Sequence, residues 1–250
     1  MDRAELDLMR RTQDVHWWYQ GRKRIVERML ARYVPVRADR SVADVGSGFG
    51  VHLSLLMGFG RVTCVEADPE AREALLRRWG DRVRVLDAKI PDPIGERFDL
   101  ILMTDVLEHV EDDAGAVDWL REHLSDGGLA LLTVPAHPCL WTQMDEAVGH
   151  YRRYRRRTLV KLLREGGLEI VRSTYYNALL LPAKLAFVLF DRLQRRRRPG
   201  APKRSYNDLP PRPVNWLFRQ VLSAEAVWLG RFGLPAGVGL IVLARRRGGG

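Results

Sequence analysis

Apolar runs separated by polar, helix-forming stretches recur along most of the chain. The clearest is Phe98 to Met103, which is almost wholly apolar and is typical of a parallel strand covered on both faces. Six further runs predict strands at 42–45, 61–68, 82–86, 129–134, 168–175 and 237–244. Because strands alternate with helical segments, we expect an α/β fold built on a doubly wound sheet of seven strands.

Helices are predicted before the first strand and between the strands. Residues 2–16 read as a polar helix, and residues 20–33 as an amphipathic helix that Pro35 ends. Further helices are expected to begin at Val51, to follow Asp68 as a cap, and to cover 114–124. Thr158 is expected to cap the helix that precedes the sixth strand.

Roughly sixty residues separate the last two predicted strands. They begin with the apolar stretch 178–190, continue through the arginine cluster 195–198 and a proline-rich linker at 199–213, and then repeat apolar residues at helical spacing from Val214 to Phe232. The apolar stretch is too short to span a bilayer and reads as an interfacial helix with a basic flank. It could instead roof an acceptor pocket, form a dimer interface, or simply cover the sheet. Residues 245–250 are expected to fray.

These patterns divide the chain into an N-terminal helical segment at 1–40, an α/β core at 41–176, a basic helical insertion at 177–236, and a last strand with its tail at 237–250.

Charge is distributed unevenly along the chain. Residues 41–135 hold nine Lys or Arg and eighteen Asp or Glu, whereas residues 151–250 hold twenty-two and five. The basic half suggests an anionic partner, which could be membrane lipid, an acidic substrate or nucleic acid, unless arginine serves only for solubility. Cys64 and Cys139 form neither a disulfide framework nor a metal cluster, so no metal site is predicted. The N-terminal residues are charged and lack the apolar core of a signal peptide, so we expect a cytoplasmic protein.

A glycine-rich turn follows the first strand. Asp44 stands two residues before Gly46, and Gly48 and Gly50 follow in the pattern D-x-G-x-G-x-G. Such glycines let the backbone turn tightly and let a ligand approach it. The dinucleotide pattern G-x-G-x-x-G fails here, because Val51 stands where the third glycine belongs. An acid before the turn suits a cofactor with a cationic end.

This stretch resembles motif I of the class I S-adenosylmethionine (SAM) dependent methyltransferases, which implies a Rossmann-like sheet with an antiparallel last strand. In that family Asp44 lies near the cofactor's amino group, and the turn of Gly46, Ser47, Gly48 and Gly50 holds its methionine portion. Glu66 follows Gly46 by twenty residues, the spacing at which a carboxylate meets ribose hydroxyls, with Ala67 beside it. The resemblance also implies that Asp87 and Ala88 lie beside the adenine.

The segment after Phe98 to Met103 reads TDVLEHVEDD and resembles the end of the fourth strand in small-molecule methyltransferases of the ubiquinone-biosynthesis type. That resemblance implies that Thr104 and Asp105 lie near the sulfonium, while Glu108 is expected to begin the next helix and pack. Acids thus close four successive strands, at Asp44, Glu66, Asp87 and Asp105. Because parallel strands end at one edge of a sheet, all four are expected to face one crevice.

Methyltransferases of this kind often carry an N-terminal helical lid, and the aromatic stretch HWWY at 16–19 fits one. Tyr19 and Arg22 are then cofactor contacts, although plain packing would explain them equally. Together with DEAVGHYRRY at 145–154, this stretch resembles a bacterial subgroup associated with envelope and natural-product pathways.

Residues 135–163 follow the fifth strand and are expected to bind the methyl acceptor. A hydroxyl acceptor needs a base, for which His150 and His137 are the candidates, with His109 behind them. Trp141, Tyr151, Arg152 and Arg153 are the candidate acceptor contacts, and the arginines suit a carboxylate or phosphate. Each of these residues could also be an ordinary surface or packing residue.

The sequence therefore predicts a cytoplasmic SAM-dependent methyltransferase that acts on an oxygen of a small hydrophobic, anionic or lipid-linked acceptor, with the inner membrane face as a possible location and a homodimer as a possible assembly. One rival is an RNA methyltransferase that uses the basic tail, against which the segment TDVLEHV lacks the N/D-P-P-Y/F tetrad and no RNA-binding module is recognisable. The other rival is a SAM-binding membrane adaptor without catalysis.

Overall fold

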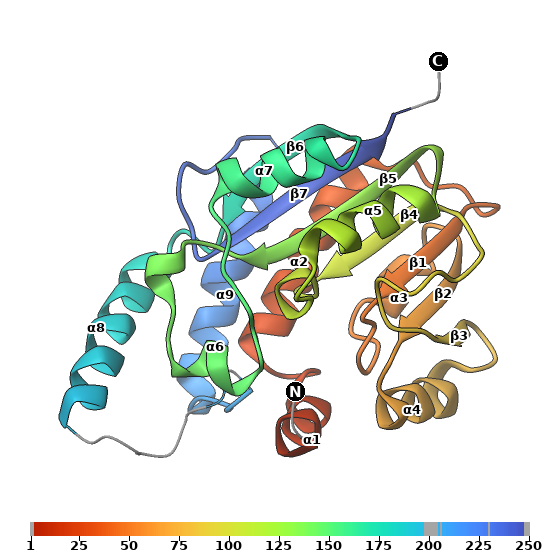
Figure 1. The fold of residues 1–250 in the computed structure, drawn as a ribbon. Helices are drawn as coiled ribbons and strands as arrows, with labels where there is room; N and C mark the ends of the chain where they lie inside the picture. The colour runs from red at the N-terminus through yellow and green to blue at the C-terminus, as the bar shows by residue number, and fades with distance from the viewer. Residues whose placement is uncertain (1–2, 198–204, 206, 230, 248–250) are drawn as a thin grey trace. The chain divides into compact units, whose positions relative to one another are not determined.

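The structure, a computed structural model, describes residues 3–197, 205, 207–229 and 231–247 and contains one seven-stranded sheet (Figure 1). The strand order is β3-β2-β1-β4-β5-β7-β6. The strands are β1 Ser41–Val45, β2 Arg61–Glu66, β3 Arg84–Asp87, β4 Phe98–Thr104, β5 Leu124–Pro135, β6 Leu168–Tyr176 and β7 Gly239–Arg246. Strand β7 runs antiparallel, so the predicted Rossmann-like fold with an antiparallel last strand is confirmed.

The first four strands of the sequence form a parallel core in which β1 lies between β2 and β4. The apolar side chains of β1, β2 and β4 are buried, which explains why these strands lack polar alternation, whereas those of the edge strand β3 are half-buried. The register pairs Glu66 with Asp87 at the ends of β2 and β3, and Thr104 with Thr133 on β4 and β5. The carboxyl ends of these strands therefore meet at one edge.

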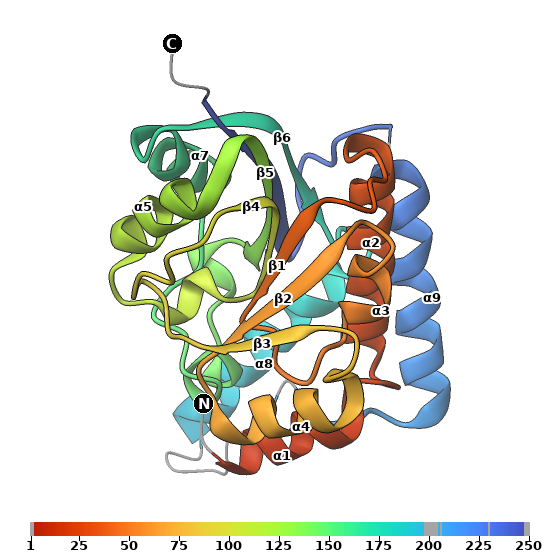
Figure 2. The same cartoon turned by 90° about the vertical axis from the view of Figure 1, so that its right-hand side faces the viewer.

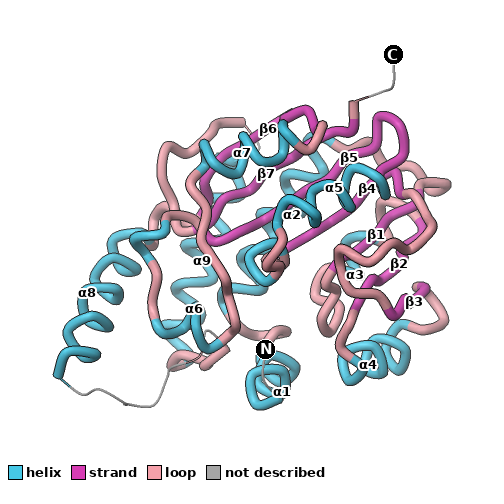
Figure 3. Tube along the Cα trace, in the orientation of Figure 1, coloured by secondary structure: helices cyan, strands magenta, loops and turns pink. Residues whose placement is uncertain are grey.

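Helices connect the strands, and α5 and α7 lie side by side (Figures 1 and 2; Figure 3 colours the same trace by secondary structure). The α-helices are α1 Arg3–Thr12, α2 Trp17–Tyr33, α3 Leu53–Leu56, α4 Pro69–Trp79, α5 Asp113–His123, α6 Gln143–Ala147, α7 Arg156–Glu165, α8 Leu181–Arg197 and α9 Arg212–Leu229. Two 3₁₀ turns accompany them, η1 Leu107–His109 and η2 Pro138–Leu140. The predicted insertion between the last two strands is thus helical, as α8 and α9.

Several predicted boundaries are wrong. Helix α7 begins at Arg156, so Thr158 lies inside it and is not its cap. Strand β5 begins at Leu124 and continues through the predicted turn at 126–128, because the register shifts between Phe98 and Leu100 and Gly127 takes a φ of 72°. The tail remains paired through Arg246, beyond the expected fraying point. Residues 248–250, residue 198 of the arginine cluster, and residues 199–204 and 206 of the predicted linker lie outside the described residues.

The chain forms two compact units. The sheet unit contains residues 30–134, 156–173 and 241–250, and the helical unit contains residues 1–29, 135–155 and 174–240. The glycine-rich turn and the four strand-end acids belong to the sheet unit, whereas residues 135–155 of the segment predicted to bind the acceptor belong to the helical unit.

Candidate functional site

The turn after β1 depends on glycine. Gly46, Gly48 and Gly50 have φ angles of 65°, 51° and 81°, in the left-handed region that other residues adopt at a cost. A Cβ on Gly46 would lie 2.5 Å from Cγ2 of Val106. Ser47 stabilises the turn, because its Oγ donates to the Asp44 carbonyl at 2.6 Å. The predicted helix after the turn shortens to α3, a single turn at Leu53–Leu56.

Glu66 joins the end of β2 to the glycine turn. One of its carboxylate oxygens accepts the Gly48 N–H at 2.7 Å, and the other accepts the Asp68 N–H at 2.9 Å. Burial raises the pKa of Glu66, although these two hydrogen bonds oppose the rise. Asp68 caps α4 by accepting the Ala71 N–H at 2.9 Å, as predicted. The Glu66 carboxylate is therefore held in place by the backbone on both sides.

Arg72, which the sequence reading did not single out, links β2 to the end of β3. Its Nη1 donates to the Ala67 carbonyl at 2.6 Å and lies 2.8 Å from Oδ1 of Asp87. The Asp87 side chain is largely exposed, and Ala88 follows it in the chain. Arg72 lies in the first turns of α4, four residues after the cap residue Asp68. Its side chain therefore links the start of α4 to the carboxyl end of β3.

Asp105 follows β4 with an unusual backbone. Its φ is 53°, its N–H donates to the Thr133 carbonyl at 2.9 Å, and its Oδ1 accepts from the Thr133 hydroxyl at 2.8 Å. Thr133 is a further site residue that the sequence did not reveal. It pairs with the buried Thr104 on β4, which places it next to Asp105, the residue after Thr104. The carboxylate is thus fixed by a neighbouring strand.

Asp44, Glu66, Asp87 and Asp105 all stand at the carboxyl ends of parallel strands. Asp44 is buried one residue before the end of β1, and the turn it precedes packs on Val106 of the β4 end. Glu108 is fully buried in η1, a 3₁₀ turn that also contains the half-buried His109, rather than in a longer helix. This edge presents negative charge beside a glycine turn, which suits a cationic, nucleoside-containing ligand.

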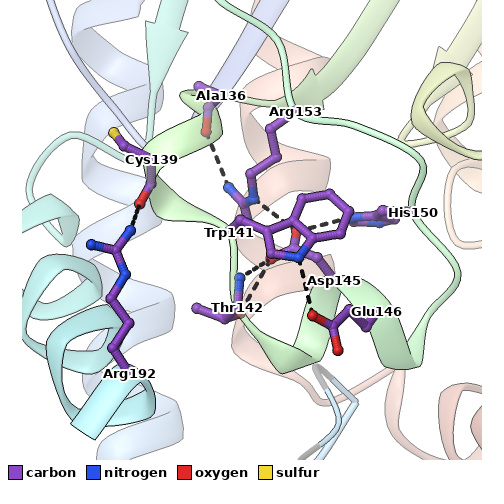
Figure 4. Close-up of polar contacts among 9 residues, drawn as sticks. All are labelled: Ala136, Cys139, Trp141, Thr142, Asp145, Glu146, His150, Arg153 and Arg192. Carbon is purple, nitrogen blue, oxygen red and sulfur yellow. Dashed lines mark hydrogen bonds and ion pairs between the residues drawn. The ribbon is translucent and has the colours of Figure 1, made fainter. Parts of the chain in front are cut away.

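In the helical unit, Asp145 is the centre of a buried polar cluster (Figure 4). Its Oδ1 accepts from Nδ1 of His150 at 3.0 Å and from Nε of Arg153 at 2.7 Å. Its Oδ2 accepts from the Thr142 N–H and hydroxyl, at 2.9 Å and 3.2 Å. Burial alone would raise the pKa of Asp145, but the hydrogen bonds from His150 and Arg153 and the positive charges of Arg153 and Lys184 hold it well below its ordinary value. Asp145 was not predicted as a site residue; the T-x-x-D spacing of a capping box was its signal.

The remaining residues of this segment lie in different surroundings. Arg153 is buried and also donates to the Ala136 carbonyl at 3.1 Å, so its guanidinium is committed to the cluster. Tyr151 is exposed with Arg152 near its ring, and Trp141 Nε1 donates to Glu146 at 3.3 Å. These side chains extend from the cluster rather than form it (Figure 4 draws Trp141 and Glu146).

His137 is held apart from the Asp145 cluster's hydrogen bonds. Its φ is 57°, and its ring stacks on Tyr175 with centroids 4.9 Å apart and an interplanar angle of 5°. Burial, Arg153 and Arg155 lower the pKa of His137, so its neutral form is favoured near neutral pH.

Tyr19 and Arg22 are buried on α2 within the helical unit. The Tyr19 hydroxyl donates to Oδ1 of Asn207 at 2.5 Å, and the Arg22 guanidinium lies 5.5 Å from the centre of the Tyr19 ring. Trp18 stacks on Tyr176 with centroids 5.7 Å apart. The aromatic stretch therefore packs against its own unit.

The Methyltransferase domain family matches residues 17–173, more than half of the chain. The chain belongs to this family, and it is a SAM-dependent methyltransferase of class I, as the sequence predicted. No curated protein matches the chain in sequence.

Solved structures share its fold. The structure of the Haloferax volcanii Trm112 methyltransferase activator in complex with a methyltransferase matches at 16% identity and a TM-score of 0.62, over 99% of this chain and 100% of that chain. The [4+2]-cyclase SpnF matches at 18% identity and a TM-score of 0.58, over 93% of this chain and 83% of that chain. A third match is Burkholderia thailandensis 1,6-didemethyltoxoflavin-N1-methyltransferase, solved with S-adenosylhomocysteine. It has 20% identity and a TM-score of 0.54, over 91% of this chain and 78% of that chain. At these identities the likeness shows the fold alone.

Proposed function

We propose that the protein transfers the methyl group of SAM to an oxygen of a small molecule that is hydrophobic, anionic or lipid-linked. The observation that carries the choice of oxygen is the hydrogen bond between Asp145 and His150, because a hydroxyl acceptor must lose a proton and a nitrogen or thiolate acceptor need not.

The residues of the sheet unit fit SAM, which supplies an electrophilic methyl group when bound. Asp44 is proposed to meet its cationic amino group, and the turn from Gly46 to Gly50 its methionine portion. Glu66, with Ala67, is proposed to accept the ribose hydroxyls, because each of its oxygens keeps a lone pair beyond the one used by Gly48 or Asp68. Asp87 and Ala88 are proposed for the adenine, Thr104 and Asp105 for the sulfonium side, and Tyr19 and Arg22 for a lid.

His150 is the proposed base. Because the carboxylate of Asp145 accepts hydrogen bonds, the proton of a neutral His150 lies on Nδ1, and Nε2 is the nitrogen proposed to take the acceptor's proton. Arg153 balances the charge of Asp145, so we revise its proposed role from acceptor contact to support of this pair. Tyr151, Arg152 and Trp141 keep the proposed role of acceptor contacts, and His137 that of an alternative base.

The test uses SAM with a labelled methyl group and the purified chain, with candidate phenols, hydroxy acids and lipid-linked acceptors. Label recovered as an O-methyl ether or ester by mass spectrometry would support the proposal, and His150→Gln should then lose turnover while it retains S-adenosylhomocysteine binding by calorimetry. Label recovered on nitrogen or carbon, with His150→Gln still active, would overturn the oxygen assignment. In parallel, NAD should not bind.

A further inference from the structure

Helix α8 of the helical unit has its polar and apolar faces reversed. Lys184, Val188 and Asp191 lie on its packed side, whereas Leu185, Leu189 and Leu193 recur every four residues on one exposed face. Leu189 is 60% exposed and Asp191 is 9% exposed. Burial lowers the pKa of Lys184 to about 7, which indicates how far this cation is withdrawn from water. A surface helix in water has the opposite arrangement.

Helix α9 of the same unit adds further exposed apolar side chains. Trp216, Leu217, Val227 and Trp228 are each at least half exposed, and Phe232 lies just beyond the helix near the Trp228 ring. Exposed tryptophans are costly in water and are typical of side chains that rest at a membrane interface. Glu225, the acid of this helix, is buried.

Charge is what decides the partner. Residues 177–236 hold eleven Lys or Arg and three Asp or Glu, and seven of the basic residues fall within 192–204. Two of the three acids, Asp191 and Glu225, are buried, whereas Arg192, Arg212 and Arg231 are exposed, so the exposed charge in the described part of this segment is mostly positive. An apolar face beside concentrated positive charge complements an anionic lipid surface.

We propose that the exposed apolar face of α8, which we call the leucine face (Leu185, Leu189 and Leu193), docks on an anionic lipid bilayer, and that the exposed tryptophans of α9, Trp216 and Trp228, add to membrane contact from the same unit. The chain would rest on the bilayer and not cross it: within the described residues, no helix has both the length and the apolar character to span a membrane. This docking is independent of the reaction and of the base assigned to it.

Two other occupants fit less well. RNA would complement the positive charge, but exposed leucines on one helix face contribute nothing to phosphate binding. A second copy would cover the apolar face, but it would bring two strongly basic segments together, and like charges oppose such an interface.

The experiment is flotation of the full chain with vesicles of phosphatidylglycerol and phosphatidylcholine, and with vesicles of phosphatidylcholine alone. We expect binding to the former that weakens with added salt. Leu189→Glu should lower the bound fraction about tenfold, because it places a carboxylate where a leucine enters the interface. Leu76→Glu is the matched control, since Leu76 is 54% exposed on α4 of the sheet unit, and it should bind as the wild type does.

Circular dichroism and size-exclusion chromatography with light scattering accompany the flotation. If Leu189→Glu does not fold, Leu193→Gln takes its place. Failure of the wild type to bind anionic vesicles would overturn the proposal, and so would equal loss in Leu189→Glu and Leu76→Glu. A wild-type dimer that Leu189→Glu dissociates, or salt-sensitive RNA binding, found in place of vesicle binding would overturn it in favour of that occupant.

Discussion

His150 Nδ1 lies 3.0 Å from Oδ1 of Asp145, a carboxylate that is fully buried and accepts hydrogen bonds on both oxygens. The same Oδ1 accepts from Arg153, while Thr142 occupies Oδ2. The imidazole is therefore oriented by a group that is itself fixed by a helix cap and an ion pair. Such a pair controls which ring nitrogen carries the proton.

Asp145→Asn should reduce kcat about tenfold to a hundredfold with a smaller change in the KM for SAM, because an amide can donate to Nδ1 and favour the wrong tautomer. The ¹⁵N shifts of the His150 ring would report the tautomer directly. Glu146→Gln, on the same helix, changes a carboxylate that accepts from the Trp141 ring instead of from His150, and it should leave both readouts unchanged. A variant with normal ring shifts and normal kcat would refute the positioning role of Asp145.

Glu66→Gln should weaken S-adenosylhomocysteine binding about tenfold, because the amide has one acceptor oxygen where the carboxylate uses two. Calorimetry measures the loss. The control is Glu73→Gln on α4, where the carboxylate pairs with Arg77 on the surface. Unchanged affinity in Glu66→Gln would contradict the proposed ribose contact.

Gly46→Ala should destabilise the protein and weaken cofactor binding, because it adds a Cβ 2.5 Å from Val106 and keeps a φ of 65°. Combining it with Val106→Ala should recover part of the loss and leave the backbone cost of roughly 1–2 kcal/mol. Gly95→Ala separates the two effects, since Gly95 has a φ of 67° and nothing within 4 Å of its added Cβ. Thermal unfolding of the four proteins should rank Gly46→Ala lowest.

His16 should make stability depend on pH. Its Nδ1 accepts the Trp18 N–H at 3.2 Å and burial lowers the pKa of His16 to about 4, so the folded state favours the neutral ring. Since the unfolded value is near 6.5, this stabilisation is complete above pH 6.5 and is lost as the pH falls toward 4, by about 3 kcal/mol. Denaturant unfolding across that range should show a shallower decline in His16→Gln. Equal slopes in the two proteins would argue against it.

Much of the sheet follows from the sequence because its strands are buried on both faces. Phe98 to Met103 could not be exposed without great cost, and β4 therefore lies where the apolar run predicts. The start of β5 was missed because Asp126, Gly127 and Gly128 have the composition of a turn, yet a bulge keeps them in the strand. β-Turns and β-bulges favour the same residue types, so the composition of this segment does not distinguish one from the other.

The partners of the site residues were harder to predict than the residues themselves. Strand register brings Thr133 to Asp105, and the packing of α4 brings Arg72 to Asp87. Neither contact can be predicted from the order of residues along the chain. Asp145 was overlooked as a functional group because it stands among charged residues and only burial distinguishes it. The roles proposed for these side chains remain predictions.

The left-handed backbone at Asp105 also limits how this position can change over evolutionary time. Glycine, asparagine and aspartate adopt a φ near 53° more readily than most residues, so most substitutions would meet a conformational penalty before any effect on chemistry. Of these three residues, aspartate alone supplies a negative charge. The backbone conformation therefore restricts the residues that evolution can place at position 105 to a few with short side chains. A requirement for negative charge would restrict them to aspartate.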